Sequence, residues 1–400
     1  MTASMGAGAH RRSLALLFAA TFVELTAIFV FGPLLLFQLQ ARGLGTALSG
    51  LFAASGWLGV LLVTPLATRL VQRLGTSRAL LLSGGLPVLT TAAIQLTDSV
   101  PGWALLNAVS GMAGALRWVL SEALIARLAP PERRGRVMGL FSTLIGGTFM
   151  LGPALLAAAL SRGVTLHQIG WIVWGLCALS LALLAFIRAP ELGAAPEGAA
   201  GEGTAAASPG LLAAVRAAPV VMVTGLVGGF FEAGLSGALP LWGLSLGWSE
   251  AAAALLVTLS GLGSTLAAAP VGELADRLPR ERLRRIGVGL CLAGALAVPW
   301  VAMPGGGWLA WPVVLLWGAA GAGLYTLAMT EIGHLHADAG HGPALVQATA
   351  VLVLAYTLGG LLSPILVGQA LAWQPRWGLA AVLIAVALAG FWRPGPRKAI

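Results

Sequence analysis

Long apolar runs, separated by short polar connections, dominate the pattern of the sequence. Most of the runs reach the roughly 20 residues that an α-helix needs to cross the hydrocarbon core of a bilayer. They predict twelve membrane-spanning helices, at residues 13–39, 47–69, 78–97, 101–127, 136–161, 168–188, 217–245, 250–272, 286–303, 308–333, 343–371 and 376–393. We therefore expect an all-α integral membrane protein.

Composition supports this fold class and excludes a soluble globular protein. Hydrophobic residues make up 58% of the chain and charged residues 9%, with a mean hydropathy of +0.90. Soluble domains carry about 25% charged residues. The net charge of +9 would suit a nucleic-acid partner, but the basic residues cluster in alternate connections between the apolar runs. That placement indicates membrane orientation, so we expect a lipid bilayer around the protein and no nucleic acid.

The basic residues also predict which side each connection faces. Successive runs must cross the membrane in alternate directions, which assigns each connection to one of two sides. The side that holds both chain ends has nineteen basic residues, the opposite side has three, and Arg117 lies within a run. Since cytoplasmic loops are enriched in arginine and lysine, both termini should be cytoplasmic, with the chain in the cell's inner (plasma) membrane. The run after Arg11 and Arg12 continues to Phe37, too long for a signal peptide, and is interpreted as the first spanning helix.

The chain divides into two halves that repeat one another. Residues 189–216 are rich in Ala, Gly, Pro and Glu, which predicts a flexible cytoplasmic linker between a bundle at 1–188 and a bundle at 217–400. Four pairs of residues recur at offsets of 208 to 211: Glu24 with Glu232, Glu122 with Glu331, Thr148 with Thr357, and Pro153 with Pro364. We expect two pseudo-symmetric six-helix bundles.

Residues 272–280 read GELADRLPR, which resembles the loop signature of the major facilitator superfamily, G-x-L-A-D-R-x-G-R-K. The first-half copy, TRLVQRLG at 68–75, has Gln72 where the signature has aspartate. The resemblance implies that Asp276 caps a helix of the neighbouring half-bundle and that Arg277 pairs with an acidic group, holding an outward-facing state. The alternative is that the arginines at 277–285 only fix the topology.

Two further elements resemble members of this superfamily. Residues 147–153, GTFMLGP, are similar to the G-x-x-x-G-P element of its exchangers, with an echo at 359–364, GGLLSP. The alternative to a role in exchange is a structural one, in which these elements allow close helix packing and a bend in the helix. The residues concerned are Gly152, Pro153, Ser363 and Pro364. The segment RWVLSE at 117–122, followed by RRGR at 133–136, resembles a bacterial branch of facilitators with no settled substrate.

Apart from the terminal residues of the runs, five acidic or basic residues fall within predicted spans: Glu24, Arg117, Glu122, Glu232 and Glu331. They lie on the first, fourth, seventh and tenth helices, which the resemblance implies line a central cavity. Charges in hydrocarbon are costly and persist where a partner, water or solute compensates them. Glu24 and Glu232 lie near mid-membrane, where burial favours the protonated form, so either could couple proton movement. The alternative is a permanently hydrogen-bonded structural carboxylate.

Arg117 is expected to be the counter-ion of Glu24 or of an anionic substrate, with a structural pair to Glu122 as the alternative. Glu122 and Glu331 lie near the cytoplasmic helix ends, so we expect a cytoplasmic gate in which they pair with loop arginines such as Arg73, Arg136 or Arg285. Aromatic side chains could face the cavity and stack on an organic solute. The candidates are Trp57, Trp118, Tyr325 and Tyr356.

We expect the protein to be a secondary active transporter that moves a small organic solute by alternating access and couples this movement to protons. Export of the solute, by antiport with protons, is one possibility. A uniporter, or a membrane sensor or receptor, is the alternative. One arginine against two mid-membrane glutamates allows a cationic, zwitterionic or amphiphilic solute.

The sequence has no phosphate-binding loop, zinc-protease motif or nucleophile elbow, so we expect that the protein is not an enzyme and binds no cofactor or metal. We also expect a monomer. The histidine-containing segment 334–341 is interpreted as a solvated loop.

Overall fold

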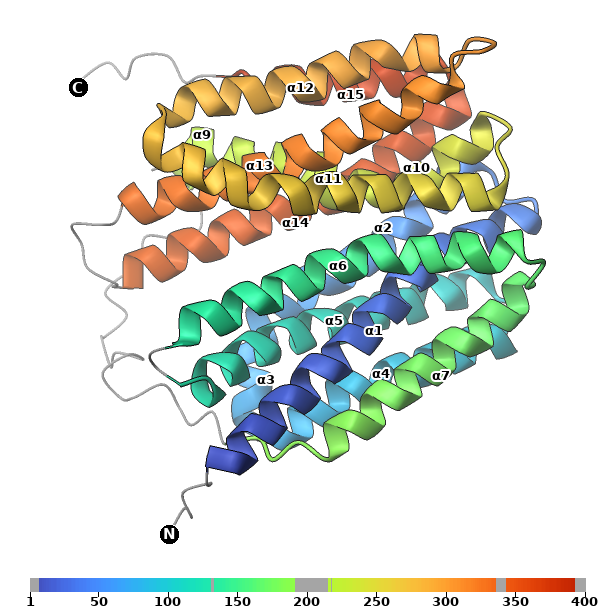
Figure 1. The fold of residues 1–400 in the computed structure, drawn as a ribbon. Helices are drawn as coiled ribbons and strands as arrows, with labels where there is room; N and C mark the ends of the chain where they lie inside the picture. The colour runs from blue at the N-terminus through green and yellow to red at the C-terminus, as the bar shows by residue number, and fades with distance from the viewer. Residues whose placement is uncertain (1–6, 131–132, 191–214, 217, 336–342, 393–400) are drawn as a thin grey trace. The chain divides into compact units, whose positions relative to one another are not determined.

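The computed structural model describes residues 7–130, 133–190, 215–216, 218–335 and 343–392, and every regular element in this part of the chain is a helix (Figure 1). The all-α prediction is therefore confirmed for the described residues. The predicted linker at 189–216 lies almost wholly outside them, and so does most of the loop at 334–341.

The first half contains the six predicted helices in order. They are α1 (Ala7–Ala41), α2 (Thr46–Val63) continued by η1 (Thr64–Leu66) and α3 (Ala67–Leu74), α4 (Thr76–Leu96), α5 (Val100–Leu128), α6 (Arg134–Ser161) and α7 (Leu166–Ala185). The second helix was predicted to end at residue 69, but helical structure continues to Leu74. Arg73 therefore lies on a helix rather than in a loop. The polar side chains of α3 can point to the aqueous phase while Ala67 and Val71 are buried.

The second half contains α9 (Pro219–Gly229), η3 (Phe230–Gly234), α10 (Leu235–Ser245), α11 (Glu250–Arg277), α12 (Arg280–Val301), η4 (Gly307–Leu309), α13 (Ala310–Leu335), α14 (Pro343–Trp373) and α15 (Trp377–Gly390). The predicted helix at 217–245 is interrupted by η3, a π-helical turn that contains Glu232. The helix predicted at 250–272 continues to Arg277 and the one predicted at 286–303 begins already at Arg280, so Asp276 and Arg277 lie in the last turn of α11.

Eleven helices among the described residues are long and apolar enough to cross a membrane, counting α2 to α3 and α9 to α10 as one span each. The twelfth apolar helix, α15, is shorter, at 14 residues. The count agrees with the twelve predicted helices, and the chain is a multi-pass membrane protein.

The described helices form two compact units, one made of the helical segments within residues 1–35 and 55–204 and the other of those within 36–54 and 205–400. In the first unit the buried core is aliphatic and aromatic, with Leu17, Leu80, Leu116 and Phe141 among its residues. In the second unit α11 packs on α13 and α9 packs on α14. Each unit thus buries one face of its helices against its own neighbours.

Glycines bring α9 and α14 into backbone contact, and this contact positions the second acidic residue. A Cβ atom at Gly229 would overlap the backbone carbonyl of Tyr356, and one at Gly359 would overlap that of Leu226. Small residues are what allow membrane helices to approach so closely. The close approach places Tyr356 of α14 beside η3.

Replacing Gly229 with alanine is expected to lower the free energy of unfolding by about 1–3 kcal/mol, because one of the two backbones must move. Gly237→Ala is the matched control, since Gly237 lies on α10 of the same span and a Cβ there meets nothing within 4 Å. Unfolding of both purified variants in denaturing detergent measures the difference. Equal stability of the two variants would show that the Gly229 contact is not tight.

Candidate functional site

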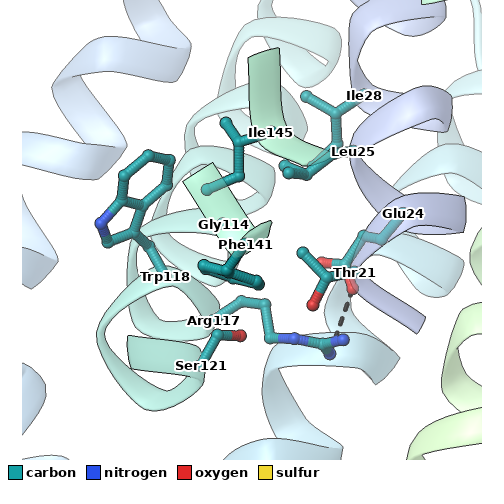
Figure 2. A pocket seen from close by; sticks show the side chains of 10 residues that line it. All are labelled: Thr21, Glu24, Leu25, Ile28, Gly114, Arg117, Trp118, Ser121, Phe141 and Ile145. Atoms are coloured by element: carbon teal, nitrogen blue, oxygen red, sulfur yellow. Dashed lines mark ion pairs between the residues drawn. The ribbon is translucent and has the colours of Figure 1, made fainter. Parts of the chain in front are cut away.

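The first unit contains a buried ion pair between α1 and α5. Arg117 Nη1 lies 3.1 Å from Glu24 Oε2, and the two side chains are 5% and 3% exposed (Figure 2). Both residues are charges that the sequence placed inside spans. Of the two carboxylates considered as partners for Arg117, the structure places Glu24 beside it and leaves Glu122 exposed on α5.

A third helix contributes a hydroxyl group to this pair. Ser180 Oγ on α7 lies 3.0 Å from Glu24 Oε2 and 3.0 Å from the backbone oxygen of Ala20. Serine has one hydroxyl hydrogen, so Ser180 cannot donate fully to both acceptors at once. If Glu24 carries a proton on Oε2, it can donate to Ser180 Oγ, and Ser180 then donates to Ala20. The surroundings therefore provide a complete chain of hydrogen bonds for the protonated acid.

The pair faces a small recess with polar atoms on one side and apolar walls on the other. The recess is lined by Thr21, Glu24, Leu25, Ile28, Gly114, Arg117, Trp118, Ser121, Phe141 and Ile145, from α1, α5 and α6 (Figure 2). It has room for about one water molecule. Figure 2 shows the Trp118 ring on the side away from Glu24. The Trp118 indole, 47% exposed, donates a hydrogen bond to Glu122.

Several buried polar atoms of this recess have no hydrogen-bond partner among the described residues. They are Thr21 Oγ1, Glu24 Oε1, Ser121 Oγ, and Nε, Nη1 and Nη2 of Arg117. The contact between Arg117 Nη1 and Glu24 is thus close in distance but is not a well-aligned hydrogen bond. A buried polar group without a partner costs about 1–3 kcal/mol, so this arrangement is complementary to a small polar guest.

The equivalent acidic residue of the second unit has neutral partners. Ser264 Oγ on α11 donates to Glu232 Oε1 at 2.5 Å, and the Tyr356 hydroxyl on α14 donates to Glu232 Oε2 at 3.1 Å. The Tyr325 ring lies at a tilt of 49° against the Tyr356 ring, with ring centroids 4.5 Å apart. Within the described residues Glu232 forms no ion pair, and the position equivalent to Arg117 is Thr326. The two acids of the repeat therefore lie in chemically different surroundings.

The charges at the helix ends that the sequence predicted to be cytoplasmic form different pairs from those expected. Glu331 on α13 lies 3.0 Å from Arg280, and Arg285 instead lies 2.8 Å from Glu281. The reason is that α12 begins at Arg280, six residues before the predicted start, which places Glu281 and Arg285 one turn apart on the same face. Within the part of the chain that the structure describes, no ion pair involves Glu122, Asp276, Arg277, Arg73 or Arg136, and the gating role of these residues stays a prediction.

The glycine and proline elements of α6 and α14 make packing contacts. A Cβ atom at Gly152 would lie 2.6 Å from Phe29 Cβ on α1, and Phe149 stacks on Phe29 with ring centroids 4.8 Å apart. Ser363 on α14 is fully buried against Gly234. Pro153 and Pro364 both lie inside their helices. Close packing accounts for the small residues, while a role in exchange stays a prediction.

The site contains residues that sequence reasoning missed, namely Thr21, Ser121, Ser180 and Ser264. Each is a small hydroxyl residue within an apolar run. In membrane helices such residues commonly bond the backbone of their own helix, as Thr26 does to the oxygen of Phe22. Their type and spacing therefore carried no signal that distinguishes a site from local capping.

Comparisons with known proteins agree with this architecture. The family model described as Major Facilitator Superfamily matches residues 17–353. An uncharacterized MFS-type transporter of Yersinia enterocolitica is 26% identical over 358 residues, covering 89% of this chain and 88% of that protein. One from Enterobacter sp. (strain 638) is 25% identical over 357 residues, with the same coverage of both proteins.

Solved structures share the fold at low sequence identity. The crystal structure of a D-xylose-proton symporter has a TM-score of 0.72 at 17% identity, and that of a nucleoside transporter has a TM-score of 0.72 at 12% identity. Each match covers 96% of this chain and 97% of the solved chain. The predicted major facilitator fold, with twelve helices in two six-helix bundles, is confirmed.

Proposed function

The chain belongs to the Major Facilitator Superfamily, and from that premise we propose that it is a proton-coupled secondary active transporter of a small organic solute. The observation that carries this proposal is the buried ion pair of Glu24 and Arg117, which lines a recess. As whole residues, Glu24 is 2% and Arg117 is 4% exposed. A transporter rather than an enzyme also fits the family.

The pair couples protons to solute because its charges compensate each other. Burying one charge without the other costs several kcal/mol, so Glu24 stays ionised while Arg117 remains its partner. When Glu24 takes up a proton, Arg117 loses its counter-charge and gains affinity for an acceptor on the solute. Proton binding and solute binding then favour each other, and this linkage works in both directions.

Ser180 supports the protonated state in this proposal. Protonated Glu24 donates to Ser180 Oγ, and Ser180 donates to the oxygen of Ala20, so no hydrogen in this chain lacks an acceptor. The D-xylose-proton symporter among the structural relatives supports proton coupling on this fold. We assign coupling to Glu24 rather than Glu232, because the partners of Glu232 among the described residues are neutral and include no cation to release.

The remaining features of the proposal follow the duplicated sequence. Bundles at residues 1–188 and 217–400, joined by a cytoplasmic linker at 189–216, would alternate access to the solute as a monomer. The nineteen-to-three distribution of basic residues supports cytoplasmic termini in a bacterial inner membrane. Labelling of a cysteine introduced at either terminus, in intact cells and in lysed cells, checks this orientation, and labelling in intact cells would reverse it.

The test is solute-driven proton movement in proteoliposomes that contain the purified protein and a trapped pH-sensitive dye. A panel of sugars, nucleosides, amino acids, organic acids and amines is added outside at zero membrane potential. We expect at least one solute to shift the internal pH towards acid, because proton and solute binding favour each other at this pair and should be transported together. A shift towards alkaline pH would indicate antiport and contradict this linkage. A labelled solute that enters with no response to a pH gradient would indicate a uniporter. Binding of a solute without flux would indicate a sensor.

A further inference from the structure

The recess beside Glu24 has more hydrogen-bond donors than acceptors. Nε, Nη1 and Nη2 of Arg117, which can only donate, lack partners among the described residues, whereas Glu24 Oε1 is the one partnerless atom there that belongs to a carboxylate; the hydroxyls of Thr21 and Ser121, also without partners, can donate or accept. All four side chains belong to residues that are at most 4% exposed. We propose that this recess binds a carboxylate group of the transported solute, which replaces Glu24 as the partner of Arg117.

A carboxylate matches the donors in shape and in charge. Its two coplanar oxygens can accept two parallel N–H bonds from a guanidinium group, which is the strongest geometry open to arginine. The hydroxyls of Thr21 and Ser121 supply further donors for the remaining lone pairs. A cationic or amide nitrogen would instead meet the N–H groups of Arg117. A phosphate dianion would bring two charges to a single guanidinium group.

The size of the recess places only the charged end of the solute inside it. Because the recess holds about one water molecule, the carboxylate needs the space that Glu24 gives up when it withdraws from Arg117. The walls beyond the polar atoms are Leu25, Ile28, Ile145 and the exposed ring of Trp118. The part of the solute next to its carboxylate is therefore apolar or aromatic.

Charge balance links this binding to the proton, and in this respect the inference rests on the proposed function. The pair of Glu24 and Arg117 is neutral, so an entering carboxylate would leave a net negative charge in a buried site unless Glu24 is protonated. The charged or titratable groups that face Glu24 among the described residues are Arg117 on α5 and the buried thiol of Cys177 on α7. The residues of α6 in the recess, Phe141 and Ile145, carry no charge.

The experiment measures binding of propionate to the purified full-length protein in detergent by saturation-transfer NMR at pH 6 and pH 8. Propionamide, the uncharged isostere, is the matched control ligand. We expect transfer to propionate at pH 6 and none to propionamide. One linked proton changes the apparent affinity by up to about tenfold per pH unit, so the signal should fall steeply at pH 8.

Variants separate the roles of the two charges. Glu24→Gln imitates the protonated acid and should bind propionate equally at both pH values. The double variant Glu24→Gln/Arg117→Gln should not bind it, which also controls for partition into the micelle. Thr21→Val and Ser121→Ala, which leave the ion pair in place, should each weaken binding by about tenfold, as expected for a hydrogen bond to a charged group.

Equal transfer to propionate and propionamide would overturn the carboxylate site, and so would unchanged binding in the double variant or in both hydroxyl variants. The measurement needs no membrane gradient, so it is independent of flux. Propionate binding linked to pH, in a protein without proton-driven flux, would leave the recess assignment standing and refute the proposed function. Proton-driven flux with no propionate binding would refute the recess assignment and leave the proposed function standing.

Discussion

Replacing Glu24 with glutamine is expected to abolish accumulation of the solute by a pH gradient. Each pH unit is worth about 1.4 kcal/mol per proton, a factor of about ten, so one coupled proton across two units supports an accumulation of about 100-fold. Glutamine can neither bind nor release a proton, and the accumulation ratio should fall to about one. Uptake of labelled solute into proteoliposomes, with the membrane potential held at zero, measures this ratio.

Two controls separate loss of coupling from loss of transport. Glu24→Gln should still exchange labelled for unlabelled solute across the membrane, since exchange requires no net proton movement. Glu232→Gln should retain accumulation, because Glu232 contacts the neutral donors Ser264 and Tyr356 and no cation. If Glu24→Gln accumulates solute like the wild type while Glu122→Gln does not, the coupling role belongs to Glu122, nearer the end of α5, and our assignment is wrong.

The sequence predicted the fold well because hydrophobic length is a strong constraint in membranes. Each of the twelve apolar runs corresponds to a helix or to a continuous series of helices. The helix ends were less accurate where polar residues continue a helix into the aqueous phase, as at Leu74, Arg277 and Arg280. The π-helical turn around Glu232 has no signature in the hydrophobic pattern, because it inserts only a local change of register.

The site was predictable in its charges but only partly in its contacts. The cost of burying Glu24 and Arg117 marked both residues as candidates. Their pairing was one of three alternatives for Arg117, beside an anionic substrate and Glu122, although helical geometry already favours Glu24 over Glu122. Glu122 lies five residues after Arg117, whereas neighbours on one helix face are three or four residues apart. The partner of Glu331 was less predictable, since it depended on the start of α12.

The hydroxyl groups of the recess were not predictable at all. Thr21, Ser121 and Ser180 resemble many other small polar residues in the spans, including Thr148, which bonds the backbone of its own helix at the oxygen of Ile145. Only the packing of α1, α5 and α7 reveals that these three hydroxyls lie near one ion pair. Such a cluster depends on contacts between segments that are far apart in the chain, and these contacts cannot be inferred from a single sequence.

Removing one member of the ion pair is expected to destabilise the protein more than removing both. Glu24→Gln leaves the buried guanidinium of Arg117 without a counter-charge, and arginine cannot become neutral by losing its proton. Breaking a buried pair in this way costs about 3–5 kcal/mol, whereas replacing both partners with neutral groups is often close to neutral. We therefore expect Glu24→Gln to unfold at lower denaturant, and Glu24→Gln/Arg117→Gln to recover to within about 1 kcal/mol of the wild type.

The pH dependence of the other single variant gives a further check on the same pair. Arg117→Gln leaves a buried carboxylate, which can become neutral by binding a proton, so its stability should rise as the pH is lowered. Glu24→Gln has no such route, and its stability should not rise in the same range. Equilibrium unfolding in denaturing detergent at pH 6 and pH 8 measures both variants. Additive losses in the double variant would mean that Glu24 and Arg117 do not compensate each other, which removes the physical basis for coupling at this pair.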